Sequence, residues 1–209
     1  MKYIIKGEEP SEFTKWKNQA NPQWTPSYDK LSGNVKDSVY GALKKEQGFI
    51  CCYCERELTE DDYHIEHLNP QERGQVDPLD FSNMLCSCQR QIKKGEPRHC
   101  GNSKDNWFDE DSFISPLNHE CEEKFKYTFD GHIEAANLID NAAVVTIEKL
   151  KLGIDKLNKM REKAIEPFID DIFSDEDLND FAKGYLIEKE DNNGKYNEFY
   201  STIKYLFVN

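Results

Sequence analysis

Six of the seven cysteines lie between residues 51 and 100, and this clustering constrains the fold more than any other feature of the chain. Cys51 and Cys54 form a CxxC pair, while Cys88 and Cys100 follow in a later stretch that is rich in turn residues. Structural zinc takes four sulfur or imidazole ligands in a tetrahedron, and two such pairs can supply them. We therefore expect a structural zinc ion held by Cys51, Cys54, Cys88 and Cys100, which contributes on the order of ten kcal/mol to folding.

Three further donors lie close to this set in the sequence, namely Cys52, Cys86 and His99. They remain alternatives as zinc ligands, because the downstream half of the pattern is CSC rather than a second CxxC. A structural or redox-sensing zinc protein, in which the cysteines are functional and the histidines incidental, is a competing interpretation. Cys121 stands apart and is expected to be a packing residue.

The composition places the chain among acidic globular proteins. It has 209 residues and a net charge of −13 at pH 7, which argues against nonspecific attraction to a polyanion. No apolar run approaches the roughly eighteen residues that a membrane span needs, and the N-terminus lacks the apolar stretch of a secretory signal. We expect a soluble cytoplasmic protein whose thiols are free or metal-bound.

One stretch departs from this acidic balance. Residues 81–108 carry five lysines and arginines against two acidic residues. A local contact with nucleic-acid phosphate is expected from this basic island, and solvated surface charges are the competing interpretation. The candidate phosphate contacts are Arg90, Lys93, Lys94 and Lys104.

Hydrophobic periodicity outside the cysteine region predicts mainly helices. A short strand is expected over Tyr3–Lys6, and a helix that enters at Pro10 and Ser11 follows it. A second helix is expected from about Val35 to Gln47, because its apolar residues recur at helical spacing and a glycine ends it.

The second half of the chain predicts a hairpin and then helices. Alternation over residues 125–129 precedes Asp130-Gly131, which supplies the positive φ angles of a tight turn. Residues 142–209 are expected to form three helices, with breaks near Pro167 and over residues 191–194.

These elements give an α+β fold that is predominantly helical. We expect an N-terminal helical segment over residues 1–48, a zinc-stapled core over residues 49–108, and a β-hairpin with a C-terminal helical region over residues 109–209.

Between the two groups of cysteines, the sequence HIEHLNP places an acid beside an imidazole. Glu66 offers a hard oxygen ligand, and His67, with an ordinary pKa of about 6.5, can take a proton from water. Neighbouring side chains diverge on an extended strand, so one can hold a metal while the other reaches a water molecule. Asn83 follows in FSNML and Asn102 in HCGNSK.

The order of CCYCE, HIEHLNP, FSNMLCSC and HCGNSK resembles the HNH endonuclease superfamily over about residues 48–108. The flanking sequences FISPL, FKYTFDGHI and TIEKLKLGIDKLNKMR resemble the HNH nucleases of Septu and retron-associated anti-phage systems, over about residues 1–165. The resemblance implies a ββα-metal core that hydrolyses phosphodiester bonds, of DNA rather than RNA, and leaves 5′-phosphate and 3′-hydroxyl ends.

The resemblance also implies a role for each motif residue. His67 would be the general base and Glu66 a ligand of catalytic Mg²⁺ or Mn²⁺. Asn83 would tie the loop and orient the histidine, and Asn102 would be the second metal ligand.

Two departures from the family pattern leave the metal site open. The residue before the base is more often Asp than Glu. A ligand three residues before a lysine is common in the family, whereas the residue three before Lys104 is Gly101. His64 and His99 therefore remain alternatives to Asn102.

The resemblance implies partners as well as chemistry. An ABC or SMC-like ATPase of the same defence system is expected, with a retron reverse transcriptase and its DNA as a further expectation. The chain contains no GxxxxGK[ST] loop, so the ATPase would be a separate chain. The competing interpretation is a catalytically silent, zinc-stabilised adaptor within such a complex.

Overall fold

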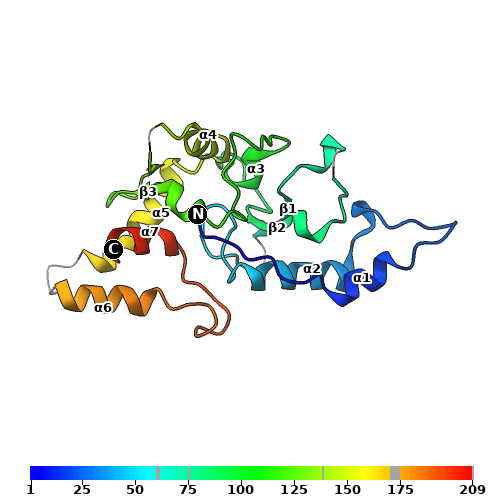
Figure 1. The fold of residues 1–209 in the computed structure, drawn as a ribbon, viewed down its shortest axis with the longest axis horizontal. Coiled ribbons are helices and arrows are strands. Elements are labelled where there is room, and N and C mark those ends of the chain that lie inside the picture. The colour runs from blue at the N-terminus through cyan, green and yellow to red at the C-terminus, as the bar shows by residue number, and fades with distance from the viewer. Residues whose placement is uncertain (60–61, 75, 138, 170–174, 209) are drawn as a thin grey trace.

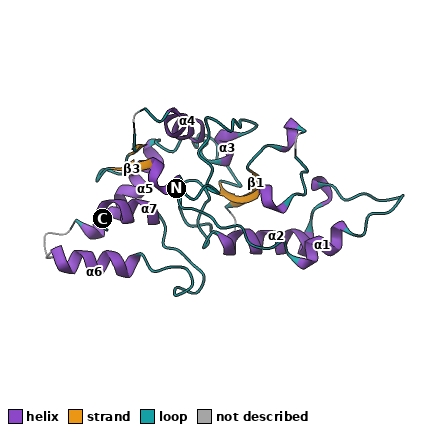
Figure 2. Cartoon of the chain, viewed as in Figure 1, coloured by secondary structure: helices purple, strands orange, loops and turns teal. Residues whose placement is uncertain are grey.

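The computed structural model describes residues 1–59, 62–74, 76–137, 139–169 and 175–208 (Figure 1). The α-helices are α1 (Ser11–Lys17), α2 (Gly33–Glu46), α3 (Gly101–Lys104), α4 (Asn141–Leu150), α5 (Asp155–Ile165), α6 (Asp175–Tyr185) and α7 (Tyr200–Phe207). The strands are β1 (Tyr63–His67), β2 (Met84–Cys88), β3 (Phe125–Tyr127) and β4 (Ile133–Ala135), in two small antiparallel sheets. Short 3₁₀ helices lie at Tyr28–Lys30, Gln71–Arg73, Phe81–Asn83, Cys121–Lys124 and Glu166–Phe168. The result is a mixed fold in which helices predominate (Figure 2).

The predicted helices at the N-terminal end are confirmed as α1 and α2. Helix α2 buries Val39 and Leu43 on one face, as the helical spacing of its apolar residues indicated. It ends where Gly48 takes a positive φ of 60° and the N–H of Phe49 donates to the carbonyl of Lys44. This turn leads the chain directly into the first cysteines.

The pair of strands β1 and β2 positions the candidate site. Their register pairs His67 with Met84 and Glu66 with Leu85, so the HIEH motif lies on one strand and FSNMLCSC supplies the other. Helix α3 follows in sequence and packs against α4, while β2 packs against α2. The strand pair therefore lies between α2 and the α3–α4 pair, as Figure 1 also shows.

The predicted β-hairpin is confirmed as β3 and β4. Its turn differs from the expectation, because Gly131 has a positive φ of 79° whereas Asp130 does not. The N–H of Thr128 donates to the carbonyl of His132, so the connection is longer than a two-residue turn.

Three helices are expected over residues 142–209, whereas the described residues there form four α-helices, α4 to α7. The apolar pattern runs on through residues 145–160, but Lys151 takes a left-handed conformation and separates α4 from α5. The carbonyl of Leu150 then accepts the N–H of Cys100, at 2.8 Å. The carbonyl at the end of α4 is thus satisfied by a tertiary hydrogen bond to the cysteine region. The apolar pattern of the sequence does not predict this bond.

Two further expectations concern the ends of the chain. Residues 1–59 are described in full, and no strand forms over Tyr3–Lys6; the N–H of Ile4 makes a single bond to the carbonyl of Pro116. Beyond the break expected near Pro167, helix α6 begins at Asp175. None of the described helices is long and apolar enough to cross a membrane.

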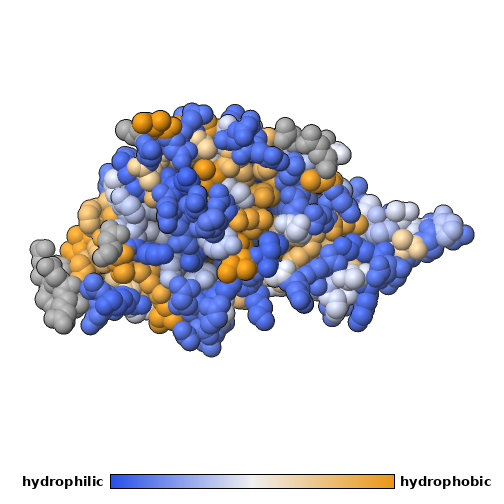
Figure 3. Space-filling model, viewed as in Figure 1, coloured by the Kyte–Doolittle hydropathy of each residue, from blue (hydrophilic) through white to orange (hydrophobic). Residues whose placement is uncertain are grey.

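The buried residues fall into two clusters. A large one draws on residues from Met1 to Leu157, including the cysteines. A smaller one in the C-terminal region consists of Ile165, Phe168, Ala182 and Ile203. On the face drawn in Figure 3, hydrophilic residues predominate over α1 and the loop that follows it.

Candidate active site

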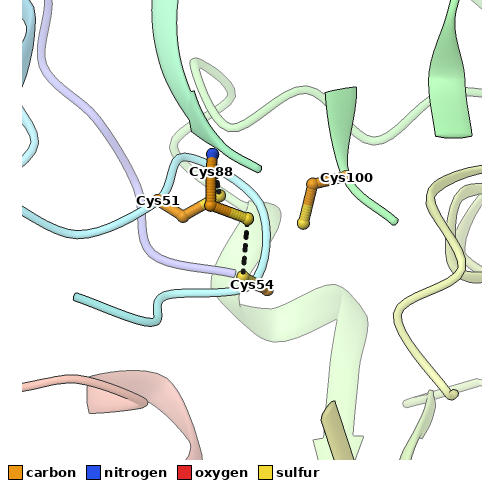
Figure 4. Close-up of side chains that lie close together, drawn as sticks. All are labelled: Cys51, Cys54, Cys88 and Cys100. Carbon is orange, nitrogen blue, oxygen red and sulfur yellow. Dashed lines mark hydrogen bonds between the residues drawn. The ribbon is translucent and has the colours of Figure 1, made fainter. Parts of the chain in front are cut away.

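Four buried cysteines from separate segments come together beside the β1–β2 pair. Cys51 and Cys54 lie in the turn after α2, Cys88 ends β2, and Cys100 immediately precedes α3. Their sulfur atoms all lie within 4.8 Å of one another, and Figure 4 shows the side chains gathered around a common centre. The fold thus brings together the four cysteines expected as ligands, and they could hold a metal ion such as zinc.

The donor chemistry of this group fits a metal ion. The N–H of Cys88 donates to the sulfur of Cys51 at 3.4 Å, a contact that favours a thiolate at Cys51. Burial raises the pKa of Cys88 and Cys100 well above the ordinary thiol value. Burial acts in the same direction on Cys51, but hydrogen bonds from the neighbouring thiols outweigh it and hold the pKa of Cys51 well below that value. Four thiols at this distance need a cation before all of them can ionise.

The three spare donors occupy different positions. Cys52 and Cys86 are buried but lie outside the group of four. His99 contacts the group, because its Nδ1 lies 3.2 Å from the sulfur of Cys100 and 3.7 Å from that of Cys88. Its Nε2 is buried and has no hydrogen-bond partner among the described residues. His99 therefore lies at the cysteine group.

The HIEH motif divides its side chains between the two faces of β1. His64 and Glu66 are two residues apart and share one face, whereas His67 points to the other. The Glu66 carboxylate is buried and its Oε1 accepts from the hydroxyl of Tyr53 at 3.1 Å and from Nζ of Lys104 at 2.8 Å. Burial alone would raise the pKa of Glu66, but His64 and Lys104 outweigh burial and lower it. Glu66 is thus held as an anion.

The second oxygen of Glu66 faces a space that a glycine keeps open. Oε2 lies 3.6 Å from Nε2 of His64, which is longer than a hydrogen bond. A Cβ added at Gly101 would lie 2.3 Å from this oxygen and 2.8 Å from this nitrogen. Any larger residue would fill the place where the carboxylate and imidazole approach each other. The donor set, one hard oxygen and one imidazole around that space, fits a divalent cation such as Mg²⁺ or Mn²⁺.

On the opposite face, Nε2 of His67 contacts a carbonyl, whereas Nδ1 has no hydrogen-bond partner among the described residues. Its Nε2 lies 3.0 Å from the carbonyl of Pro78, and because a carbonyl only accepts, Nε2 carries the hydrogen. The neutral ring therefore keeps its lone pair on Nδ1. Burial lowers the pKa of His67 below its ordinary value, so the ring is neutral at physiological pH. The Tyr28 ring packs edge-on against it, with 4.7 Å between centroids.

Asn83 ties the chain after β1 to the start of β2. Its Oδ1 accepts from the N–H of Asn69 at 2.8 Å, and its Nδ2 donates to the carbonyl of Asn69 at 2.9 Å. The N–H of Leu68, next to the histidine, donates to the carbonyl of Asn83 at 2.9 Å. The backbone that follows His67 is thus fixed at three points.

Asn102 and Lys104 make contacts that the sequence does not predict. The amide nitrogen of Asn102 donates to the carbonyl of Gln89 at 2.6 Å, so this side chain serves the loop after β2. Lys104 was expected on the surface as a phosphate contact, but it is only 2% exposed and its ammonium pairs with Glu66. It also donates to the carbonyl of His67 at 3.0 Å. The last residue of α3 faces the strand pair, and that places the lysine inside.

The other three basic candidates lie on the loop after β2. Arg90, Lys93 and Lys94 are all exposed, and all three precede Cys100 in the sequence. Their ammonium and guanidinium groups are open to a ligand, in contrast to that of Lys104.

Sequence reasoning missed four residues that shape the site. Tyr53, between the first two cysteines, binds Glu66, and Tyr28 covers His67. The carbonyl of Pro78 fixes the tautomer of His67, and Gly101 leaves the space between Glu66 and His64 open. The signal for Gly101 was in the motif, since it occupies the position where the family often has a ligand. The other three carry no signal, because only the fold brings them near β1.

An anionic carboxylate and a neutral imidazole on one strand, beside four gathered thiols, form a candidate hydrolytic site. A protein of Vibrio cholerae serotype O1 biovar El Tor, described as "Retron Vc95 putative HNH endonuclease", is 30% identical over 142 residues, which cover 65% of this chain and 67% of that relative. The chain belongs to the HNH endonuclease family. No family model matches the sequence.

Proposed function

We propose that this protein is a metal-dependent endonuclease that hydrolyses phosphodiester bonds in DNA. One observation carries the proposal: a single strand presents an ionised Glu66 on one face and a neutral His67, with Nδ1 free, on the other. This arrangement supports an attack on phosphorus in which the base and the charge-neutralising group act on different sides of the phosphate.

The residues of the chain would act as follows. Nδ1 of His67 takes a proton from water as the water oxygen bonds to phosphorus. The bond from phosphorus to the 3′ oxygen breaks, the 3′ oxygen gains a proton from solvent, and a 5′-phosphate remains. The Pro78 carbonyl and the Tyr28 ring hold the imidazole in its orientation, and the Asn83 amide holds the backbone beside it.

Glu66 and His64 would hold the catalytic Mg²⁺ or Mn²⁺, which neutralises phosphate charge and stabilises the departing oxygen. We infer that His64 rather than Asn102 completes this pair, because Nε2 of His64 faces Glu66 whereas the Asn102 amide is bonded to Gln89. Zinc held by the four cysteines would brace the strand pair and α3 as a ββα-metal core over residues 49–108, between the segments 1–48 and 109–209. Arg90, Lys93 and Lys94 would contact phosphate.

The biological setting is part of the same proposal. The name of the Vibrio cholerae relative includes the word retron. We propose that this chain is the nuclease of an anti-phage defence complex. An ABC or SMC-like ATPase would bring DNA to a chain whose net charge of −13 repels it, and a retron reverse transcriptase with its DNA would be a further partner.

The test is cleavage of supercoiled plasmid DNA with and without added Mg²⁺ or Mn²⁺, by the protein alone and together with its ATPase. We expect cleavage only with the divalent ion. His64→Ala should abolish it, while Asn102→Ala should retain it. No cleavage of DNA under any of these conditions, by a folded and zinc-loaded protein, would support the silent adaptor instead.

A further inference from the structure

Tyrosine side chains extend from His67 onto helix α2. The Tyr28 ring packs against the imidazole of His67, and Tyr40 on α2 packs edge-on against Tyr63 at the start of β1, with 4.9 Å between centroids. The two pairs are close neighbours, because the ammonium of Lys36 lies 5.9 Å from the ring centroids of both Tyr28 and Tyr40. The two ring pairs, with the ammonium of Lys36 between them, thus extend from the candidate base to the middle of α2.

Lysines alternate with these rings. Lys36, Tyr40 and Lys44 are four residues apart and share one face of α2. The ammonium of Lys44 lies 4.2 Å from the centroid of the Tyr63 ring and donates to its hydroxyl at 3.1 Å. At about 1.5 Å per residue, the two lysines are about 12 Å apart along the helix. That interval covers about three phosphates of one strand of a duplex, which rise by about 3.4 Å each.

Lys36 and Lys44 lack the carboxylate partner that several other lysines of the N-terminal segment have. Lys2, Lys6 and Lys17 each form an ion pair. Among the described residues, neither Lys36 nor Lys44 has an acidic oxygen within 4.0 Å. Of the acidic residues on α2 and in the turn at Tyr28–Lys30, Asp29 and Asp37 are exposed and form no such pair with these lysines, and Glu46 pairs with Lys6. Two cations left unpaired in a chain of net charge −13, beside the candidate base, are available to an anionic ligand.

We propose that Lys36 and Lys44, with the partly exposed rings of Tyr28 and Tyr63 and with Tyr40 buried beneath them, form a tyrosine–lysine surface that binds the phosphate backbone of a DNA duplex leading to His67. The inference rests on the proposed function and adds a binding surface from the N-terminal segment, outside the basic island of residues 81–108. The rings pack edge-on and ammonium groups lie near them, so they offer no open stacking platform for unpaired bases. A paired strand, whose phosphates are its exposed groups, fits this surface.

The experiment measures binding of a fluorescent DNA duplex of random sequence across a series of salt concentrations, in a His67→Ala background that prevents cleavage. Each lysine–phosphate contact contributes about 0.9 to the slope of log K against log salt. The pair Lys36→Gln and Lys44→Gln should therefore reduce the magnitude of the slope by about 1.8 and weaken binding. The matched control is Lys159→Gln with Lys163→Gln, two exposed lysines four residues apart on α5.

The outcomes separate this inference from the proposed function. The inference holds if the slope falls for the α2 pair and not for the α5 pair, with equal melting temperatures and zinc contents. It is overturned if both pairs bind as the parent does, or if a single strand of the same length binds more tightly than the duplex. Wild-type protein that cleaves DNA while the α2 pair is without effect would leave the proposed function intact; wild-type protein that neither binds nor cleaves DNA would remove both.

Discussion

The cysteine-rich core and the C-terminal helical region are held together by different forces. Around β1 and β2 the described structure is short strands, turns and a four-residue helix, joined by four thiols and by hydrogen bonds from buried side chains such as Asn83. The C-terminal cluster instead packs Phe168 against Phe207 and Tyr185, with ring centroids 5.0 and 5.3 Å apart. The first region adds fixed polar atoms to its apolar burial, whereas the smaller C-terminal cluster consists of packed apolar side chains.

The two regions meet at one buried carboxylate. Glu55 follows the CxxC pair, and its Oε2 accepts the N–H of Ser201 in the first turn of α7, at 2.7 Å. The N–H of Phe199 donates to the Glu55 carbonyl at 3.0 Å. An anion at the start of a helix is favourable there. The cysteine turn and α7 are thus directly connected. If the two regions nevertheless unfold independently, a substitution in one should leave the stability of the other unchanged.

The largest effect is expected from Cys54→Ser, which removes one ligand of the proposed zinc site. Because structural zinc contributes on the order of ten kcal/mol, the core should lose its metal and its fold together. Metal content by mass spectrometry and near-ultraviolet circular dichroism measure this. Cys121→Ser is the matched control, since Cys121 is buried away from the four thiols. Equal zinc content in both variants would remove the ligand assignment.

Ile203→Ala should loosen the other region. Ile203 is fully buried in the C-terminal cluster, and truncation of such a residue costs about 2–5 kcal/mol. Chemical denaturation should show this loss, while zinc content stays that of the wild type. Release of zinc at the same denaturant concentration as loss of helix, in both proteins, would show that the two regions unfold as one unit.

A smaller and more local effect is expected from Gly101→Ala. The added Cβ would meet Oε2 of Glu66 at 2.3 Å, so Glu66 and His64 must shift. We expect Mn²⁺ affinity to fall about ten- to a hundredfold, as for other changes that disturb the orientation of metal ligands, with little change in stability. Gly184→Ala is the control, because the space around Gly184 is open. Unchanged Mn²⁺ binding in Gly101→Ala would show that the cation lies elsewhere.

The outcome at Gly101 also shows what the sequence could and could not predict. Spacing and residue type were sufficient for the four thiols, the HIEH strand and the helix before them. The sequence leaves His64 and Asn102 as alternatives, and our preference for His64 depends on the absence of a side chain at Gly101 and on the bond from Asn102 to Gln89. The end of α4 before Lys151 could not be predicted either, because the helical spacing of apolar residues continues past this position.

The smallest effect is expected from pH, at a contact that joins the N-terminal segment to α7. Burial would raise the pKa of Glu122, but Lys2 and Lys204 outweigh it and lower the pKa to about 2. The stabilisation is therefore present above about pH 4.5, the unfolded value, and is lost as the pH falls toward 2. After allowance for solvent screening it is worth about 1 kcal/mol. Denaturation at pH 7 and pH 3 should show a smaller loss in Glu122→Gln than in wild type; equal losses would contradict the assignment.

The most direct test of the account is to measure Mn²⁺ binding by electron paramagnetic resonance together with plasmid cleavage, in wild type and His67→Ala. The account predicts that His67→Ala binds Mn²⁺ and zinc as wild type does, because its side chain lies on the opposite face of β1 from Glu66, while cleavage falls by about 10²–10⁴-fold. Cleavage at the wild-type rate, or loss of Mn²⁺ along with activity, would contradict the separation of base and metal on one strand.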